Sequence, residues 1–236
     1  MNTSKECGDA MAKLHCTNAE NSLFYESISL DLLPDFAARG GLDSGCDLDL
    51  IKNYIDKTNS ILEVGAGYGR VIFNLLEKGY DKKLVAIERS KRFCDLLKQN
   101  YDGKLEVINT DIKIFESSSQ FDLILWLWSG ICDFSQEEQA IILSKVASFL
   151  KKDGVLVVDS LLPSIQPANA ETHNEKYSII PGGNNSKLYV YTPSPEEIKA
   201  YSKLAGLDFM KSISYMTTTN RNRMLYLLSR HPFPAD

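Results

Sequence analysis

The chain has 236 residues, of which 44% are hydrophobic and 24% charged, and its formal net charge is −5. These values predict one globular domain with additions and a core of ordinary size. The acidic balance gives no general footprint for nucleic acid. No apolar run approaches the 18 residues of a membrane-spanning helix, and the polar start lacks the apolar core of a signal peptide. We therefore expect no nucleic-acid partner and no membrane association.

The five cysteines are scattered along the chain, and no Cys-x-x-Cys pair occurs. This spacing indicates neither a zinc site nor a disulfide framework. It is typical of free thiols in a reducing compartment. The sequence therefore predicts a cytoplasmic protein without a bound metal.

The first 48 residues are expected to form a helical cap or lid in front of the main domain, which we place at residues 49–236. Residues 1–21 show no clear period. Residues 21–38 carry a broad apolar surface and predict a helix, which Pro34 should kink or divide and the Arg39-Gly40-Gly41 sequence should end. A second short helix is expected over residues 48–55.

Residues 61–70 read Ile-Leu-Glu-Val-Gly-Ala-Gly-Tyr-Gly-Arg. A short apolar run ends in three alternating glycines, and an amphipathic stretch follows at once, which predicts a strand, a tight turn and a helix. The glycines let the turn take positive φ and let a ligand lie directly on the backbone. The helix N-terminus beyond offers unpaired N–H groups. This arrangement predicts a nucleotide-like ligand at the carboxyl end of the first strand.

The spacing of the glycines decides between kinds of nucleotide. A dinucleotide fingerprint needs a third glycine where Arg70 stands, and a P-loop needs a Gly-Lys-Ser/Thr sequence that is absent. The Glu-x-Gly-x-Gly-x-Gly pattern instead resembles motif I of the class I S-adenosylmethionine-dependent methyltransferases. A glycine-rich turn that binds no ligand is the alternative at this stretch.

Apolar strands alternate with helices after the glycine turn, which predicts right-handed crossovers and a doubly wound α/β sheet. Continuous apolar runs of this kind are typical of parallel strands that are buried on both faces. The five expected strands are residues 61–64, 84–87, 105–108, 121–128 and 155–158. The expected helices are residues 70–78, a helix capped by Ser90, and a helix from the Ser135 capping box to about residue 152.

The pattern breaks after the fifth strand. Residues 161–192 are polar and marked by prolines, with a possible hairpin of residues 177–180 and 187–192. A helix starts after Ser194, and two antiparallel strands at 207–216 and 223–229 close the chain. This order resembles class I methyltransferases, which implies a Rossmann-like, seven-stranded sheet of order 3-2-1-4-5-7-6 with strand 7 antiparallel. The resemblance makes residues 161–192 a substrate-side insertion.

Three acids stand at three successive strand ends, where side chains of parallel strands meet at one crevice. Glu88 can accept hydrogen bonds from both ribose hydroxyls, Asp111 from the adenine amine, and Glu63 can orient a methionyl ammonium. Each acid taken singly is equally a solvated strand end. The resemblance implies S-adenosyl-L-methionine as cofactor, with ligands at Glu63, Gly65, Ala66, Gly67, Gly69, Glu88, Arg89, Asp111, Ile112 and Trp126.

The end of strand 4 carries the candidates for the methyl-acceptor side. Trp128-Ser129 resembles the aromatic–serine pair of small-molecule N-methyltransferases, including those that act on amino sugars of antibiotics, and Gly69-Arg70-Val71 recurs in the same group. Both tryptophans have core packing as the alternative. The candidate catalytic residues are Trp128, Tyr25 on the N-terminal helix and His173 in the polar insertion. Asp133 is a further candidate base.

These observations predict transfer of a methyl group to a small-molecule acceptor, at nitrogen or oxygen. Because the sulfonium is already activated, the protein mainly supplies proximity and alignment, which contribute about 7–11 kcal/mol. The alternatives are a protein or RNA methyltransferase of the same fold, and a binding protein without catalysis. The lack of an Asn-Pro-Pro-Tyr or Asp-Pro-Pro-Tyr sequence after strand 4 disfavours amide or nucleobase nitrogen. Pairing of two chains through the terminal hairpin stays open.

Overall fold

The computed structural model describes residues 17–163, 165, 170–172 and 174–231. Its main sheet has seven strands in the order β3-β2-β1-β4-β5-β10-β9, which confirms the predicted order. The strands are β1 (Ser60–Val64), β2 (Lys83–Glu88), β3 (Glu106–Asn109), β4 (Phe121–Trp126), β5 (Leu150–Leu161), β9 (Asp208–Met216) and β10 (Asn222–Ser229).

Strands β1 to β5 run parallel, and β10 pairs antiparallel with both β5 and β9. The turn between β9 and β10 is too short for a parallel crossover, as the sequence predicts. The carboxyl ends of the five parallel strands therefore meet at one edge of the sheet, where the site is built.

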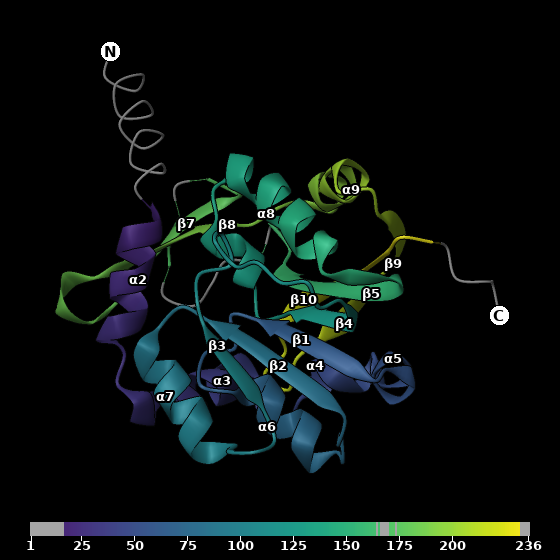
Figure 1. The fold of residues 1–236 in the computed structure, drawn as a ribbon. Helices are drawn as coiled ribbons and strands as arrows, with labels where there is room; N and C mark the ends of the chain where they lie inside the picture. The colour runs from purple at the N-terminus through teal and green to yellow at the C-terminus, as the bar shows by residue number, and fades with distance from the viewer. Residues whose placement is uncertain (1–16, 164, 166–169, 173, 232–236) are drawn as a thin grey trace.

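Helices cover both faces of the sheet (Figure 1). One face packs against α8 (Gln136–Ser148) and α9 (Pro195–Leu204), and the other against α4 (Cys46–Asp49), α5 (Lys52–Lys57), α6 (Arg70–Glu77) and α7 (Lys91–Asn100). Successive strand residues point to opposite faces, so that Ile61 packs beneath α6 while Leu62 packs toward α8. Burial on both faces explains the continuous apolar runs.

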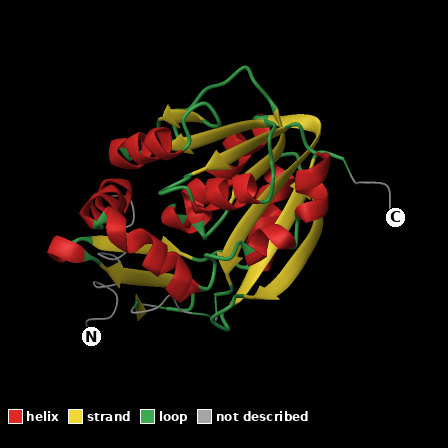
Figure 2. Ribbon diagram, turned by 90° about the horizontal axis from the view of Figure 1, so that it is seen from below, coloured by secondary structure: helices red, strands yellow, loops and turns green. Residues whose placement is uncertain are grey.

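A second sheet of three strands lies apart from the main one, and Figure 2 shows the two groups of strands. It contains β6 (Glu171–Thr172), β7 (Tyr177–Pro181) and β8 (Lys187–Tyr191), with the short η3 (Gly183–Asn185) between the last two. The hairpin of β7 and β8 confirms the predicted pairing. Helix α2 (Thr17–Ser27) packs on β8.

The N-terminal region differs from the expected single helix. Helix α2 ends at Ser27, and the chain continues through η1 (Leu30–Leu32) into α3 (Leu33–Gly40). Pro34 lies in the first turn of α3, where its missing N–H has no helical partner to lose, so it starts a helix instead of dividing one. Gly41, with φ of 69°, ends α3 as expected. The helix predicted over residues 48–55 is two short helices, α4 and α5.

Two boundaries around β4 and β5 were predicted wrongly. Strand β4 stops at Trp126 because Trp128 and Ser129 take left-handed backbone conformations. Helix α8 ends at Ser148 instead of near residue 152, and β5 starts at Leu150 instead of residue 155, so that Asp153 and Gly154 lie inside the strand. The register shifts between Phe121 and Leu123, and a Cβ added at Gly154 would lie 2.9 Å from the Phe121 carbonyl oxygen, so this irregularity needs glycine.

Among the residues that the structure describes, no helix is both long enough and apolar enough to cross a membrane.

Candidate functional site

The first two glycines of the turn leave the backbone open. Gly65 and Gly67 have φ of 71° and 54°, and a Cβ added at either would meet no described atom within 4 Å. The N–H groups of Gly65 and Ala66 donate to the Ile87 carbonyl oxygen at 2.9 and 3.1 Å, which holds the turn against β2. The turn therefore presents bare backbone at the carboxyl edge of the sheet, as a ligand lying on it requires.

The third glycine, Gly69, is tightly packed, unlike the first two. Gly69 has φ of 96°, and a Cβ there would lie 2.6 Å from Leu97 Cδ2 and 3.1 Å from the Tyr101 ring. Both side chains belong to the α7 region and close over the glycine. The structure thus gives Gly69 a packing role between the turn and α7, and its contact with the cofactor stays a prediction.

Glu88 at the end of β2 is tied to the glycine turn. Its side chain is buried, and its carboxylate accepts from Gly67 N at 2.8 Å and from Ser90 N at 2.7 Å. Burial raises the pKa of Glu88, and the N–H groups of Ser90 and Gly67 act in the opposite direction. Because a carboxylate offers about four acceptor positions, two remain for further donors such as ribose hydroxyls.

Ser90 is the N-cap residue of α7, as predicted, but its side chain makes no capping hydrogen bond. Its Oγ instead donates to Glu26 Oε1 at 2.5 Å. The N-terminus of α7 is thereby joined to α2, and the Glu88 carboxylate takes the Ser90 N–H.

The carboxyl group of Glu63 in β1 is buried and incompletely hydrogen-bonded. Its side chain is 4% exposed, and Oε2 has no hydrogen-bond partner among the described residues. Burial raises the pKa of Glu63 to about 8, although the nearby Arg70 acts to lower it. A buried carboxylate without a partner is costly. The position therefore fits a cationic group, such as the ammonium of a methionyl moiety.

Asp111 and its neighbours form the third part of the same edge. Asp111 Oδ1 accepts from Lys113 N at 2.8 Å, and Thr110 N donates to the Glu88 carbonyl oxygen at 3.0 Å, so the ends of β2 and β3 are joined. The side chain of Ile112 is buried in the core. These contacts bring Glu63, Glu88 and Asp111 to one edge of the sheet, as the sequence predicts.

The two tryptophans after β4 have separate surroundings. Trp126 is 1% exposed and packs against Phe134, with ring centroids 5.8 Å apart, so its side chain belongs to the core, and its contact with the cofactor stays a prediction. Trp128 is half-buried near the turn. Its ring lies 6.5 Å from that of Tyr68 and 5.7 Å from the guanidinium carbon of Arg70.

Tyr25 of α2 reaches the same edge from the N-terminal region. Its hydroxyl donates to Asp133 Oδ1 at 3.2 Å, and Asp133 ends η2 (Gly130–Asp133), directly after β4. The Arg89 guanidinium lies 5.5 Å from the Tyr25 ring, which places Arg89 against α2. The third predicted catalytic residue, His173, lies outside the described residues.

Burial raises the pKa of Asp133 to about 6, although Arg89 and the Tyr25 hydroxyl act to lower it. Burial and the neighbouring Asp133 raise the pKa of Tyr25 well above its usual value. The pair thus offers a carboxylate that is mostly ionised at neutral pH and a hydroxyl that keeps its proton.

Sequence reasoning missed the buried ion pair of Arg70 and Asp47. The Arg70 guanidinium contacts both Asp47 carboxylate oxygens, at 3.0 and 2.7 Å, and donates to the Leu42 carbonyl oxygen at 2.8 Å. Their side chains are 4% and 0% exposed. In the sequence, Arg70 replaces a third glycine, forms part of the Gly69-Arg70-Val71 resemblance and starts an amphipathic helix, and none of these indicates a buried ion pair. Nothing around Asp47 in the sequence indicates a buried acid.

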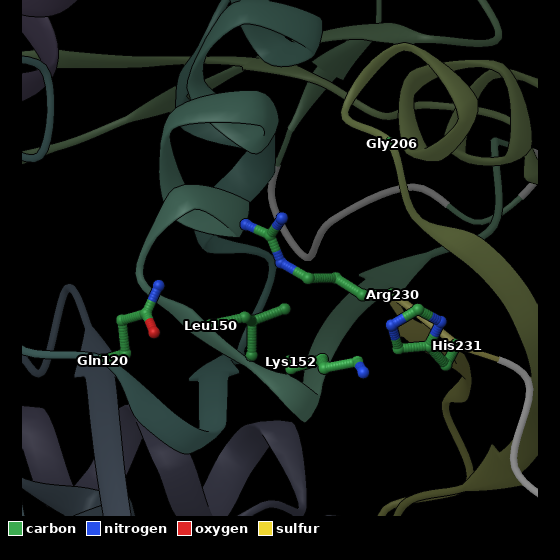
Figure 3. A pocket seen from close by; sticks show the side chains of 6 residues that line it. All are labelled: Gln120, Leu150, Lys152, Gly206, Arg230 and His231. Atoms are coloured by element: carbon green, nitrogen blue, oxygen red, sulfur yellow. The ribbon is translucent and has the colours of Figure 1, made fainter.

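Figure 3 shows a cavity of about 410 Å³ elsewhere in the molecule, with Lys152, Arg230 and His231 among its lining residues. It includes Gln120 and Leu150, at the amino ends of β4 and β5. It therefore lies at the opposite edge of the sheet from the glycine turn and takes no part in the site described above.

Comparison with known proteins agrees with this geometry. Residues 61–154 match the sequence family described as "Methyltransferase domain", a range that spans the glycine turn, Glu88, Asp111 and η2. The matched range is less than half of the chain, and within it the sequence is similar to a methyltransferase domain. The cofactor of such domains is S-adenosylmethionine.

Solved methyltransferase structures share the fold at low identity. CalS10, an amino pentose methyltransferase from Micromonospora echinaspora, is 15% identical with a TM-score of 0.63, over 85% of this chain and 97% of that one. DesVI from Streptomyces venezuelae is 16% identical with a TM-score of 0.60, over 92% and 97% of the chains. CcbJ from Streptomyces caelestis is 14% identical with a TM-score of 0.62, over 80% and 95%. At such identities the likeness concerns the fold alone.

Among curated proteins, the ribosomal RNA small subunit methyltransferase A of Pelagibacter ubique is 37% identical over 73 residues. That stretch is 30% of this chain and 28% of the relative, so the match concerns part of a domain.

Proposed function

We propose that the chain transfers a methyl group from S-adenosylmethionine to an amine nitrogen of a small molecule. The observation that carries the proposal is the Tyr25–Asp133 pair, joined by a 3.2 Å hydrogen bond at the edge where the glycine turn lies. Asp133 follows β4, while Tyr25 comes from α2, so the pair joins the N-terminal region to the carboxyl edge of the sheet. Several neighbours in fold are named as N-methyltransferases or an amino pentose methyltransferase, which supports the same class of acceptor.

The residues on the cofactor side fit this role. When bound, S-adenosylmethionine supplies a methyl group that its sulfonium has already activated for displacement. We assign the open backbone of Gly65 and Gly67 to the surface under the ligand, and the free acceptor positions of Glu88 to the ribose. The uncompensated Glu63 carboxyl is assigned to the ammonium group, since burial next to a cation removes the cost of its charge.

An amine acceptor suits Asp133 better than an alcohol does. The acceptor nitrogen gains positive charge during methylation, and a carboxylate that accepts a hydrogen bond from its N–H stabilises that charge where it develops. An alcohol needs its proton removed, and a carboxylate with a pKa of about 6 is a weak base for that purpose. This difference supports nitrogen over oxygen.

The contacts of α2 across the carboxyl edge of the sheet support a small acceptor. Asn21 of α2 donates to the Tyr189 carbonyl oxygen in β8 at 3.0 Å and to the Asp133 carbonyl oxygen at 3.1 Å. At the other end of α2, Arg92 of α7 donates to the Glu26 carbonyl oxygen at 2.6 Å. Helix α2 thus spans the carboxyl edge from the β7–β8 hairpin to α7, which favours a compact acceptor over a folded polymer.

The acceptor side is tested with labelled S-adenosylmethionine and a panel of small amines and alcohols. We expect Asp133→Asn to lower transfer to the best amine about 100-fold and Tyr25→Phe about tenfold, because the charge on the acceptor loses its counter-group. Cofactor affinity should stay within twofold in both variants. Asp153→Asn, at an exposed position of β5, is the matched control. Wild-type turnover in Asp133→Asn contradicts the assignment.

The cofactor side is tested by calorimetry with S-adenosylmethionine. Glu88→Ala should reduce binding at least about 100-fold, because both the ribose contact and the support of Gly67 are lost. Glu77→Ala, an exposed acid at the end of α6, should bind like the wild type. A wild-type protein that gives no binding heat would instead indicate a protein without cofactor-dependent activity.

A second candidate is methylation of RNA, which the partial match to a ribosomal RNA methyltransferase supports. The net charge of −5 weighs against it, since nucleic-acid binding rests on cationic contacts to phosphate. Binding to bulk RNA that weakens steeply with salt would favour this candidate. Absence of such binding at low salt would exclude it.

A cytoplasmic location remains a prediction from the sequence. The same holds for pairing of two chains through β9 and β10, which sedimentation of the purified protein would test.

A further inference from the structure

The backbone directly after β4 is strained at two consecutive residues. Trp128 and Ser129 have φ of 52° and 60°, in the left-handed region that residues other than glycine rarely enter. For a side chain as bulky as tryptophan this conformation is an outlier. It persists only where surrounding contacts hold it, and such strain is concentrated at functional sites.

The contacts that hold this turn come from a buried ion pair. Ser129 Oγ accepts from Arg223 Nη2 at 2.7 Å, and Ser129 N donates to Asp159 Oδ2 at 3.3 Å. The Arg223 guanidinium contacts both carboxylate oxygens of Asp159, with Nη2 2.5 Å from Oδ2, and the Tyr215 hydroxyl donates to Oδ1 at 3.0 Å. Asp159 and Arg223 are 0% and 4% exposed.

The pair lies on β5 and β10, whereas the turn follows β4. A buried ion pair by itself is weak evidence for stability, because apolar residues of similar volume often stabilise a core as well. Here both partners bond Ser129, one through its hydroxyl and one through its N–H. On the other side of the turn the Trp128 ring faces Tyr68 and Arg70, which flank the last glycine of the turn after β1.

We propose that Arg223 and Asp159 are positioning residues that hold the strained Trp128–Ser129 turn and thereby fix the Trp128 ring against the glycine turn. This inference rests on the proposed function, since the ring then forms the wall between the cofactor and the acceptor. Without the ion pair, the Trp128 ring takes more than one position, while the rest of the fold is kept.

The test uses protein labelled with 5-fluorotryptophan and ¹⁹F NMR. The chain has two tryptophans, so Trp126 in the core serves as an internal reference for Trp128. Trp128→Phe assigns the two signals. In wild-type protein we expect one narrow Trp128 line that shifts when S-adenosylmethionine is added.

In Ser129→Ala and in Arg223→Met we expect the Trp128 line to broaden or split, and its shift with cofactor to fall at least about threefold, while the Trp126 line stays unchanged. In Arg223→Lys we expect the width and the cofactor shift of the Trp128 line to lie between those of the wild type and of Arg223→Met. Lysine keeps the charge but lacks the planar fork that reaches Asp159 and Ser129 together. Ser144→Ala, a half-buried serine on α8, is the control.

A wild-type Trp128 line in Ser129→Ala overturns the proposal. If Arg223→Met loses both tryptophan signals through unfolding, Ser129→Ala decides alone, because it leaves the ion pair intact. Failure of the proposed function is recognised separately, by a wild-type protein in which S-adenosylmethionine gives neither a binding heat nor a shift of either line.

Discussion

The two parts of the proposed site, the cofactor side and the acceptor side, are assembled in different ways. On the cofactor side, the contact between Gly67 and Glu88 joins residues 21 positions apart, in the turn after β1 and at the end of the neighbouring strand β2. On the acceptor side, the Tyr25–Asp133 contact spans 108 positions, and the Asn21–Tyr189 contact spans 168. The first half is therefore set by one strand–turn–helix unit and the strand that pairs with it, whereas the second depends on the N-terminal region, η2 and the small sheet docking together.

This difference separates two kinds of constraint. The cofactor half can be carried intact within a segment of about 50 residues, so one motif is enough to indicate it. The acceptor half changes whenever any of its three contributing segments changes, which suits a fold that hosts many substrates. The predictions below test that separation, from the largest expected effect to the smallest.

Arg70 belongs to the local strand–turn–helix unit but also makes a long-range contact, because it joins the glycine turn to the segment around Asp47. We expect Arg70→Met to lower the free energy of unfolding by about 3–5 kcal/mol, since it leaves Asp47 buried without its partner. Urea denaturation followed by circular dichroism measures the change.

Lys78→Met is the matched control, because Lys78, directly after α6, pairs with Asp49 of α4 at the surface and so joins the same two segments. We expect a loss below about 1 kcal/mol there. Equal losses in the two variants would show that the buried pair does not join the N-terminal segment to the turn.

Glu63 gives the cofactor half a dependence on pH. With its pKa raised to about 8, Glu63 is mostly protonated at pH 7 in the protein without cofactor. Binding of the cofactor ammonium to the carboxylate should then release close to one proton at pH 7, and affinity should rise up to about tenfold from pH 6 to pH 7. Calorimetry in two buffers of different ionisation enthalpy measures the release, and Glu63→Gln should abolish it.

The same group affects stability without cofactor. The unfolded chain loses the Glu63 proton near its usual pKa of 4.5, whereas the folded chain keeps it to about pH 8. Folding therefore takes up a proton between these values, so the contribution of Glu63 to stability falls as pH rises from about 4.5 to 8 and is constant above. Glu63→Gln should flatten this slope, and an unchanged slope would contradict the assignment.

Gly67 and Gly69 lie in the same turn, but the first is open on its Cβ side and the second is packed. We expect Gly69→Ala to destabilise the fold by about 1–3 kcal/mol, because its Cβ would overlap Leu97, with little further effect on cofactor affinity. Gly67→Ala should cost about 1 kcal/mol through its positive φ and lower cofactor affinity about tenfold, since its methyl group enters the open side of the turn. Thermal melting measures the stability of each variant, and calorimetry measures its cofactor affinity. A larger loss of affinity in Gly69→Ala than in Gly67→Ala would contradict these two roles.

Much of the cofactor half could be predicted because its signals are local. The glycines, the apolar strands and the acids at their ends lie in sequence order, and one rule about parallel strands brings them together. Even there, the packing role of Gly69 depends on Leu97 and Tyr101, which no spacing rule connects to it.

The remainder depends on tertiary contacts. The apolar run 121–128 reads as strand to its end, yet Arg223 and Asp159 impose a left-handed turn at its last residue, as tertiary context overrides propensity. The pairing of Arg70 with Asp47 likewise joins residues 23 positions apart, in two helices that no motif connects.

Asn21 of α2 has one further consequence. Its buried amide donates to the carbonyl oxygens of Asp133 and Tyr189 and accepts from the Tyr189 N–H at 2.8 Å. An aspartate at position 21 has no N–H groups to donate, and a leucine makes none of the three hydrogen bonds, so neither replaces the asparagine. The N-terminal region, η2 and β8 are thus joined at a single side chain, so α2 cannot separate from either neighbour without breaking hydrogen bonds of Asn21.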